Sequence, residues 1–254
     1  MTMALVITTT GLLSPVIFLL GDFPSAASWP YIIASAILNN AYFFLLILAY
    51  KVGDLSHAYP LARGSAPLMV ALGAAVFAGE SLRPLEVLGV LVVSGAIISL
   101  MLVRGDGSRM SWPKLIYPLA TGLMIASYTV VDGIGVRLSG SPAGYIGALF
   151  MLSPIPILII AYLCRGPRFW QYLKSSWQRG VAGGVLNLGS YGLAIWALSL
   201  GAMAYVSALR ETSVIIAALI GARLLHEPFG ARRIVAAVMV VVGVIIMSLP
   251  SGQW

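Results

Sequence analysis

The sequence predicts an all-α, polytopic membrane helix bundle in which nine transmembrane helices form two inverted repeats, of four and five helices. Sixty per cent of the residues are hydrophobic and only 9% are charged, whereas a soluble domain carries roughly 25% charged residues. Nine apolar stretches are each long enough to cross about 30 Å of hydrocarbon. A shift of 147 residues, the difference between Asn40 and Asn187, aligns the rare polar residues of the two halves.

The nine predicted spans are joined by short connections, so that no water-soluble domain is inserted. They cover residues 3–20, 29–51, 56–78, 83–103, 113–137, 141–164, 179–200, 203–225 and 230–249. The first span follows the initial residues directly, without the basic segment or cleavage site of a signal peptide.

Two of the spans carry prolines that interrupt helical hydrogen bonding. Pro60 and Pro67 flank Arg63 in the third span and predict a broken or bent helix start there. Pro154 and Pro156 predict the same for the sixth span. Glycines crowd the seventh span, where close helix packing is the main interpretation and a gating bend is the alternative.

The longest connection, residues 165–179, mixes cations with aromatic rings. This pattern is typical of a segment at the membrane interface, with rings at the headgroups and cations toward anionic lipid. Contact with substrate or nucleic acid is the alternative. The single cysteine, Cys164, excludes an intrachain disulfide.

The cations divide unevenly between the two membrane faces. Arg63 and Arg210 fall inside spans, and Arg83 and Arg137 lie on one face. The other eleven of the 15 share the opposite face: Lys51, Arg104, Arg109, Lys114, Arg165, Arg168, Lys174, Arg179, Arg223, Arg232 and Arg233. The positive-inside rule assigns that face to the cytoplasm, with the N-terminus inside. This distribution explains the basic pI of 9.8 without nucleic acid.

The repeat appears in the pairs that the 147-residue shift aligns: Asn40 with Asn187, Arg63 with Arg210, Ser65 with Thr212 and Glu80 with Glu227. The first repeat then covers residues 1–104 with four spans, and the second covers 113–250 with five. Because five spans per repeat is an odd number, the two copies are inverted in the membrane. One helix before residue 1 is expected to be missing, which predicts an exposed groove beside span 29–51 or 56–78, or a helix recruited from another protomer.

The strongest family resemblance lies in two aligned segments. They read AYKVGDLSHAYPLARGSAPLMVALGAAVFAGESL and WALSLGAMAYVSALRETSVIIAALIGARLLHEPF. A short-connected helix pair, a small-residue helix, a following Glu and a Gly-bearing apolar helix resemble the EamA type of the drug/metabolite transporter superfamily. The resemblance implies ten helices in two inverted repeats, a central cavity, and export or exchange of small metabolites across a cell inner membrane. It also implies cytoplasmic termini at both ends, which conflicts with the charge distribution.

The two intramembrane arginines are the main candidates for substrate binding, since an ionisable residue within a span is costly. Arg63 and Arg210 are each the eighth residue of a span, roughly 10 Å below opposite membrane faces. Two guanidinium groups in one cavity favour a substrate that carries carboxylate or phosphate. The alternatives are snorkelling to the interface and a permanent salt bridge between helices.

The carboxylates Glu211 and Asp132 are candidates for coupling or ion pairing. Glu211 follows Arg210 and faces about 100° away from it, so it needs another partner or a proton. A proton-loading role and a fixed ion pair are both open. Asp132 lies at a depth similar to that of Arg210, which predicts an Asp132–Arg210 pair.

The uncharged polar candidates are Asn40, Asn187, Tyr59 and Tyr191, with Tyr128 and Ser190 as further cavity-lining residues. The two asparagines could bind substrate or join helices by hydrogen bonds. We predict that the partners of the protein are a small-molecule substrate and the lipid bilayer. We predict no nucleic-acid partner and no cofactor. A homo-oligomer stays open.

Other chemistries find little support in the sequence. Neither His57 nor His226 has metal-ligand spacing, and no P-loop is present. An intramembrane enzyme built around Asp132 would need a second carboxylate beside it, and no matching Asp motif occurs. A lipid-carrier flippase on the same fold is the stronger alternative to a metabolite transporter.

Overall fold

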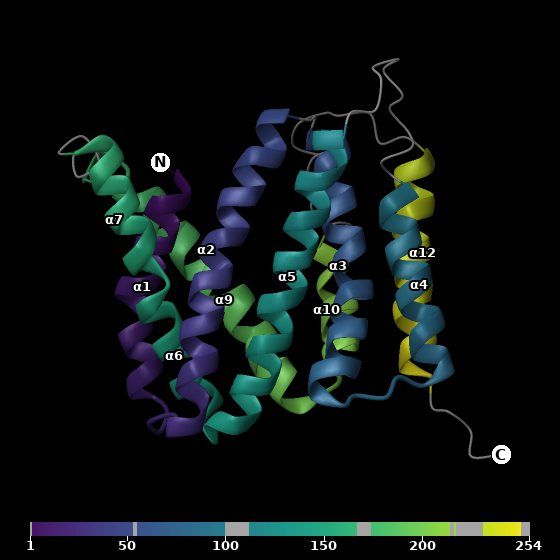
Figure 1. The fold of residues 1–254 in the computed structure, drawn as a ribbon, viewed down its shortest axis with the longest axis horizontal. Coiled ribbons are helices and arrows are strands. Elements are labelled where there is room, and N and C mark those ends of the chain that lie inside the picture. Colours follow the sequence, from purple (N-terminus) through teal and green to yellow (C-terminus); the bar gives the residue numbers. More distant parts are fainter. Residues whose placement is uncertain are drawn as a thin grey trace. The chain divides into compact units, whose positions relative to one another are not determined.

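The computed structural model describes residues 2–52, 55–99, 112–166, 174–213, 216 and 231–249. All regular elements in these segments are helical, which confirms the all-α part of the predicted fold class (Figure 1). They are α1 (Thr2–Leu19), η1 (Ala26–Ser28), α2 (Trp29–Val52), α3 (Leu55–Ala78), α4 (Pro84–Ser99), α5 (Trp112–Ser139), α6 (Pro142–Leu152), α7 (Pro154–Arg165), α9 (Trp177–Leu200), α10 (Met203–Arg210) and α12 (Ala231–Ser248).

The helices have the length and composition of membrane spans. Within the described part of the chain, five apolar segments are long enough to cross a bilayer: Ala26–Lys51, Ala58–Ala78, Trp112–Ser139, Pro142–Ile160 and Trp177–Leu200. Three shorter apolar helices are Ala4–Leu19, Pro84–Ser99 and Ile234–Ser248. Leu12, Leu72 and Leu186 are each about 70% exposed. Such an apolar surface suits contact with lipid, because soluble proteins rarely expose extended apolar patches.

The described helices form two compact units. Unit 1 contains Met1–Ala41 and Val131–Gly201, and unit 2 contains Tyr42–Val130 and Ala202–Trp254. Each unit therefore combines segments from both predicted repeats. The repeat boundaries themselves, 1–104 and 113–250, stay a prediction.

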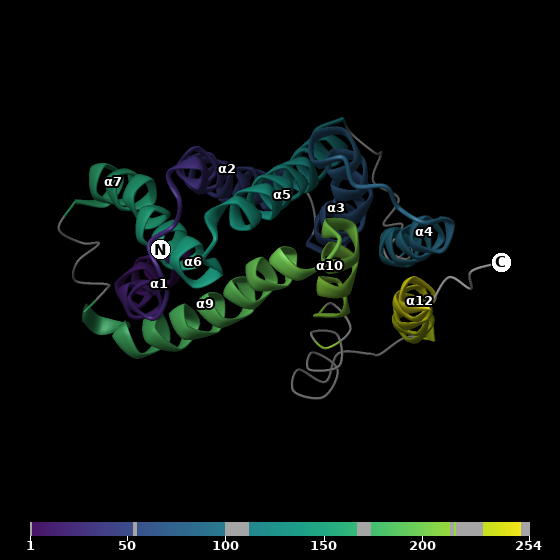
Figure 2. The same cartoon turned by 90° about the horizontal axis from the view of Figure 1, so that it is seen from below.

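Unit 1 is built around α1, which packs against α6, α7 and α9 (Figure 2). Glycines allow the close approach. A Cβ on Gly147 of α6 would lie 2.6 Å from the Cα of Phe18, and a Cβ on Gly184 of α9 would lie 2.6 Å from the Oγ1 of Thr9. The Thr9 hydroxyl donates to the Gly180 carbonyl at 2.6 Å. The glycine-rich part of α9 thus serves helix packing, the main interpretation from the sequence.

The predicted span 141–164 consists of two helices. α6 ends at Leu152 and α7 begins at Pro154, with Ser153 between them. Pro154 and Pro156 have no N–H to donate to carbonyls one turn earlier, so the interruption predicted from these prolines is confirmed. Gly11 of α1 lies directly against Pro154, where a Cβ would overlap the proline ring.

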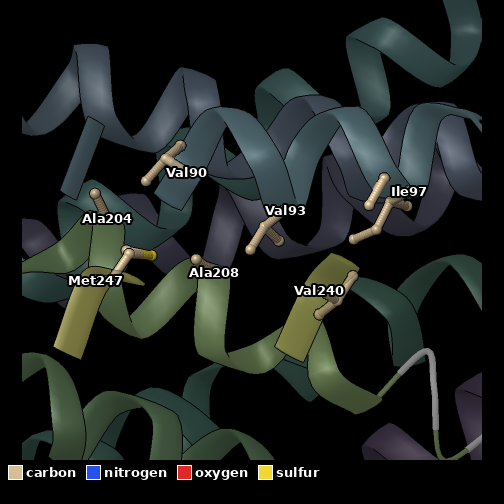
Figure 3. Packing of buried hydrophobic residues seen from close by; sticks show 8 residues of the cluster. Val90, Val93, Ile97, Ala204, Ala208, Val240 and Met247 are labelled. Atoms are coloured by element: carbon tan, nitrogen blue, oxygen red, sulfur yellow. The ribbon is translucent and has the colours of Figure 1, made fainter. Parts of the chain in front are cut away.

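Unit 2 has its apolar core where α4 and α12 meet α10. Val90, Val93, Ala96 and Ile97 of α4 pack with Val240 and Met247 of α12 and with Ala204 and Ala208 of α10 (Figure 3). Gly89 of α4 lies against Met247 of α12, and Val93 of α4 lies against Gly243 of α12. α4 and α12 therefore run antiparallel, as Figure 1 also shows.

The two helices approach closely because each presents a glycine. A Cβ on Gly89 would overlap Met247, and a Cβ on Gly243 would lie 2.7 Å from Val93 Cγ2. Small residues at such contacts let helix backbones pack tightly without a hydrophobic driving force in lipid.

The helices α3 and α10 are also neighbours in unit 2. The carboxylate of Glu80, just after α3, accepts a hydrogen bond of 2.9 Å from the Met203 N–H at the start of α10. Gly79 permits this turn, since its φ of +66° lies in the left-handed region. The end of α3 thus meets the beginning of α10, and the two helices run antiparallel.

α3 and α10 differ in continuity, contrary to one prediction. α3 continues through Pro60 and Pro67 from Leu55 to Ala78, so the helix is not broken near Arg63, and the alternative of a bend stays a prediction. α10 instead ends at Arg210, eight residues into the predicted span 203–225. Residues 217–225 lie outside the described part of the chain.

Candidate functional site

Arg63 of α3 forms a buried ion pair in unit 2. Its Nε donates to Glu211 Oε2 at 3.0 Å, and the side chains of Arg63 and Glu211 are 15% and 2% exposed. Its Nη2 also donates to the Ser213 hydroxyl at 3.3 Å. Arg63 is therefore directed at protein groups, and Glu211 has the partner that the sequence analysis required for it.

The end of α10 positions Glu211. Its N–H donates to the Ala208 carbonyl at 3.0 Å, which closes a tighter turn than an α-helical one. The backbone of Glu211 keeps helical angles, and its side chain pairs with Arg63 of α3. An interruption within a membrane helix is tolerated where polar groups are buried in protein or line a cavity.

Three tyrosines lie near the ion pair. Tyr59, Tyr128 and Tyr42 are within electrostatic range of the Arg63 guanidinium. The rings of Tyr42 and Tyr128 pack edge to face with their centroids 5.8 Å apart. The resulting site combines one cation, one anion and several phenol hydroxyls, and we call it the Arg63 site.

The sequence analysis named Tyr59 and Tyr128 but missed Tyr42. Its signal was available, since Tyr42 lies two residues after Asn40 in a largely apolar helix. Nothing in the spacing, however, relates Tyr42 to Arg63, because the two residues lie on different helices.

Arg210, which the 147-residue shift aligns with Arg63, is the last residue of α10 and is partly buried. The same 147-residue shift aligns Glu211 with Gly64. The Arg63–Glu211 ion pair therefore has no equivalent at the aligned positions, since residue 64 is a glycine. The shared cavity predicted for both arginines stays a prediction.

Asp132 is the centre of a second polar cluster, in unit 1. It is 0% exposed. Its Oδ1 accepts a hydrogen bond of 2.9 Å from the Tyr145 hydroxyl, and its Oδ2 accepts one from the Tyr191 hydroxyl. Tyr145 was not among the predicted residues. The predicted Asp132–Arg210 pair would join the two units and stays a prediction.

Both asparagines form hydrogen bonds between helices in unit 1. The Asn40 amide donates at 3.1 Å to the Ser153 carbonyl, at the interruption between α6 and α7. The Asn187 amide donates at 3.2 Å to the Thr10 hydroxyl of α1. These contacts match the helix-joining alternative, and a role in substrate binding stays a prediction.

Comparison with known proteins identifies the family. The EamA-like transporter family matches residues 112–249, more than half of the 254 residues. The chain belongs to the EamA-like transporter family. This confirms the resemblance drawn from the aligned segments, and it makes this EamA-like protein a membrane transporter of the drug/metabolite transporter type.

The fold of this EamA-like protein also occurs among solved structures. A chain described only as "Crystal structure of protein" has a TM-score of 0.70 and 18% sequence identity to it. The similarity covers 97% of the EamA-like chain and 86% of the other chain. At this identity the likeness concerns the fold alone. No curated protein matches the sequence.

Proposed function

We propose that this EamA-like protein is a secondary transporter that exports or exchanges a small anionic metabolite, with the Arg63 site as its binding site. The buried Arg63–Glu211 pair carries the proposal. Arginine's planar group can bind a carboxylate or phosphate through two parallel hydrogen bonds. A substrate anion can therefore take the place of Glu211 at Arg63, while the tyrosine hydroxyls offer further hydrogen bonds.

We further propose that the transporter consists of two inverted repeats, with nine transmembrane helices in this chain. Three observations on helix direction support this. The 147-residue shift aligns α3 with α10, α4 with α12, and α1 with the α6–α7 segment. The first two pairs are antiparallel neighbours within unit 2. In unit 1, Gly147 lies against Phe18 and Pro154 against Gly11, so α1 and α6–α7 are antiparallel as well.

The hydrogen bonds of the asparagines support the same symmetry. Asn40 in the first repeat donates to the α6–α7 segment of the second. Asn187 in the second repeat donates to α1 of the first. Such reciprocal contacts are expected of two copies related by a twofold axis, with the binding site between them near the bilayer midplane.

We place the protein in a cell inner membrane with its eleven-cation face in the cytoplasm. The two cations on the other face have local structural partners. Arg83 pairs with Glu86 at 2.7 Å. Arg137 donates to the Leu198 and Gly201 carbonyls at the end of α9. These helix-end interactions explain why two cations lie on that face. The excess of cations on the opposite face therefore still supports the proposed orientation.

Cysteine cross-linking tests the inverted arrangement. In a Cys164→Ser background, Gly89→Cys with Met247→Cys should form a disulfide, because a Cβ at Gly89 overlaps Met247. A matched pair, Gly89→Cys with Val240→Cys, should not, since Val240 lies about 10 Å further along the helix and disulfides need Cα atoms within roughly 7 Å. A protease site inserted at residue 107 reports the bond, because only a disulfide then holds the fragments together. The reverse pattern would require parallel helices and contradict the inversion.

Counterflow in proteoliposomes tests the transport function. Vesicles preloaded with one solute should accumulate the same radiolabelled solute only if the protein exchanges it. We expect exchange for some members of a panel of mono- and dicarboxylates and phosphate esters, and slower exchange for their neutral amides and alcohols. Empty vesicles provide the background. Faster exchange of the neutral analogues would contradict an anion site at Arg63.

A further inference from the structure

Asp132 occupies a position that the proposed anion site does not use. It lies in unit 1, on α5, seven residues before the helix ends at Ser139, or about 10 Å inside the span. It is 0% exposed, and each of its oxygens accepts a hydrogen bond from a tyrosine hydroxyl, Tyr145 of α6 on one side and Tyr191 of α9 on the other. Three helices thus bring polar groups to one buried carboxylate.

A fourth helix adds an unused hydroxyl at the same level. Ser35 of α2 is 0% exposed, and its Oγ has no hydrogen-bond partner among the described residues. Ser25, just before α2, donates through its hydroxyl to the Leu138 carbonyl at 2.7 Å, and a Cβ on Gly135 would lie 2.6 Å from Tyr31 Cβ. α2 therefore begins at the end of α5 and runs antiparallel to it.

This register brings Ser35 to the depth of Asp132. Ser35 lies one turn beyond Tyr31 on α2, and Asp132 lies one turn before Gly135 on α5. Because the helices are antiparallel and Tyr31 contacts Gly135, these two steps lead to the same depth. A buried hydroxyl without a partner is unusual, because such groups are nearly always hydrogen-bonded.

The hydroxyls of Tyr145, Tyr191 and Ser35 offer hydrogen-bond partners for both the ionised and the protonated form of the Asp132 carboxyl group. The ionised form accepts hydrogen bonds only, and Tyr145 and Tyr191 supply two donors. The protonated form has an O–H that needs an acceptor, and Ser35 Oγ is a free acceptor on the facing helix. A residue with only a structural role would need partners for one form alone.

From this juxtaposition we infer that Asp132 is a proton-binding site of the transport cycle, with Tyr145 and Tyr191 holding its ionised form and Ser35 accepting from its protonated form. The carboxylate takes one proton from water on one side of the membrane and later returns it on the other, so the site changes from −1 to neutral and back. The inference rests on the proposed transport function and adds its coupling ion.

Other titratable groups near Asp132 are few in the described helices. Tyr31 faces it from α2, Tyr145 from α6 and Tyr191 from α9, and α1 has no titratable side chain. On α5 itself, the Arg137 guanidinium donates to carbonyls at the end of α9. Asp22, in the loop before η1, is exposed. Among the described carboxyl groups of unit 1, Asp132 is therefore the buried one and Asp22 the exposed one.

Infrared difference spectroscopy of the protein in liposomes tests the site without any substrate. Lowering the pH should produce carbonyl bands of protonated carboxylic acids, and Asp132→Asn should remove one band among them. Glu86→Gln, which changes a helix-end carboxylate paired with Arg83, should keep it. Ser35→Ala should shift the band frequency, because the acid loses its acceptor. An unchanged set of bands in Asp132→Asn, or no band shift in Ser35→Ala, would overturn the assignment.

Proteoliposome transport separates this inference from the proposed function. With the solute that the wild-type protein exchanges, a gradient of one pH unit should drive up to about tenfold accumulation per coupled proton. Asp132→Asn should keep exchange at equal pH while its accumulation falls to onefold. Full accumulation by Asp132→Asn would overturn the proton site and leave the transporter intact. No exchange of any anion by the wild-type protein would instead refute the proposed function, and the infrared band would still decide the proton site.

Discussion

The double variant Arg63→Gln/Glu211→Gln is expected to fold and to exchange an anionic solute at least about a hundredfold more slowly than the wild-type protein. It removes both charges of the buried pair, so no uncompensated charge is left. The substrate anion, however, loses its guanidinium partner. Charge-assisted hydrogen bonds are worth about 1.5–3 kcal/mol each, and two of them correspond to a hundredfold change or more.

Initial rates of counterflow measure this effect, with the amount of folded protein determined by size-exclusion chromatography. The matched control is Arg83→Gln/Glu86→Gln, which removes an ion pair at a helix end whose arginine is 51% exposed. We expect this control to transport at the parent rate. Parent-rate anion exchange by the Arg63 double variant would rule out the Arg63 site as the substrate site.

The single variant Glu211→Gln should be much less stable than the double variant. Removing one partner of a buried ion pair leaves the other charge uncompensated, which costs about 3–5 kcal/mol. Glu211 is 2% exposed and Arg63 only 15%, so water can relieve little of this cost. Glu86→Gln, at the exposed pair, should cost no more than about 1 kcal/mol.

Denaturant-induced unfolding in detergent micelles measures the difference, with the four variants Arg63→Gln, Glu211→Gln, their combination and the parent forming a double-mutant cycle. The combination should recover most of the stability lost in either single variant. Strictly additive losses would mean that the two side chains do not interact, and the ion pair would have to be abandoned.

Much of the fold was predictable because lipid imposes a simple rule on the sequence. A span must be apolar over about 20 residues, so the helices could be located from hydropathy alone. The interruption at Pro154 was predictable for a similar reason, since proline lacks an N–H. The 147-residue shift, visible in a few polar residues, also aligned α4 with α12 before their antiparallel packing was known.

Other features depended on contacts between distant parts of the chain. The sequence alone determined that Arg63 is an intramembrane cation and that Glu211 needs a partner, because burying a charge is costly anywhere in a span. Only the tertiary structure paired them, since 148 residues separate them and they lie on different helical segments. It likewise decided that α3 stays continuous through Pro60 and Pro67 and that Asp132 accepts from Tyr145 and Tyr191. Hydropathy indicates which residues lie within the membrane. Which side chains become neighbours depends on how the helices are rotated and packed against each other.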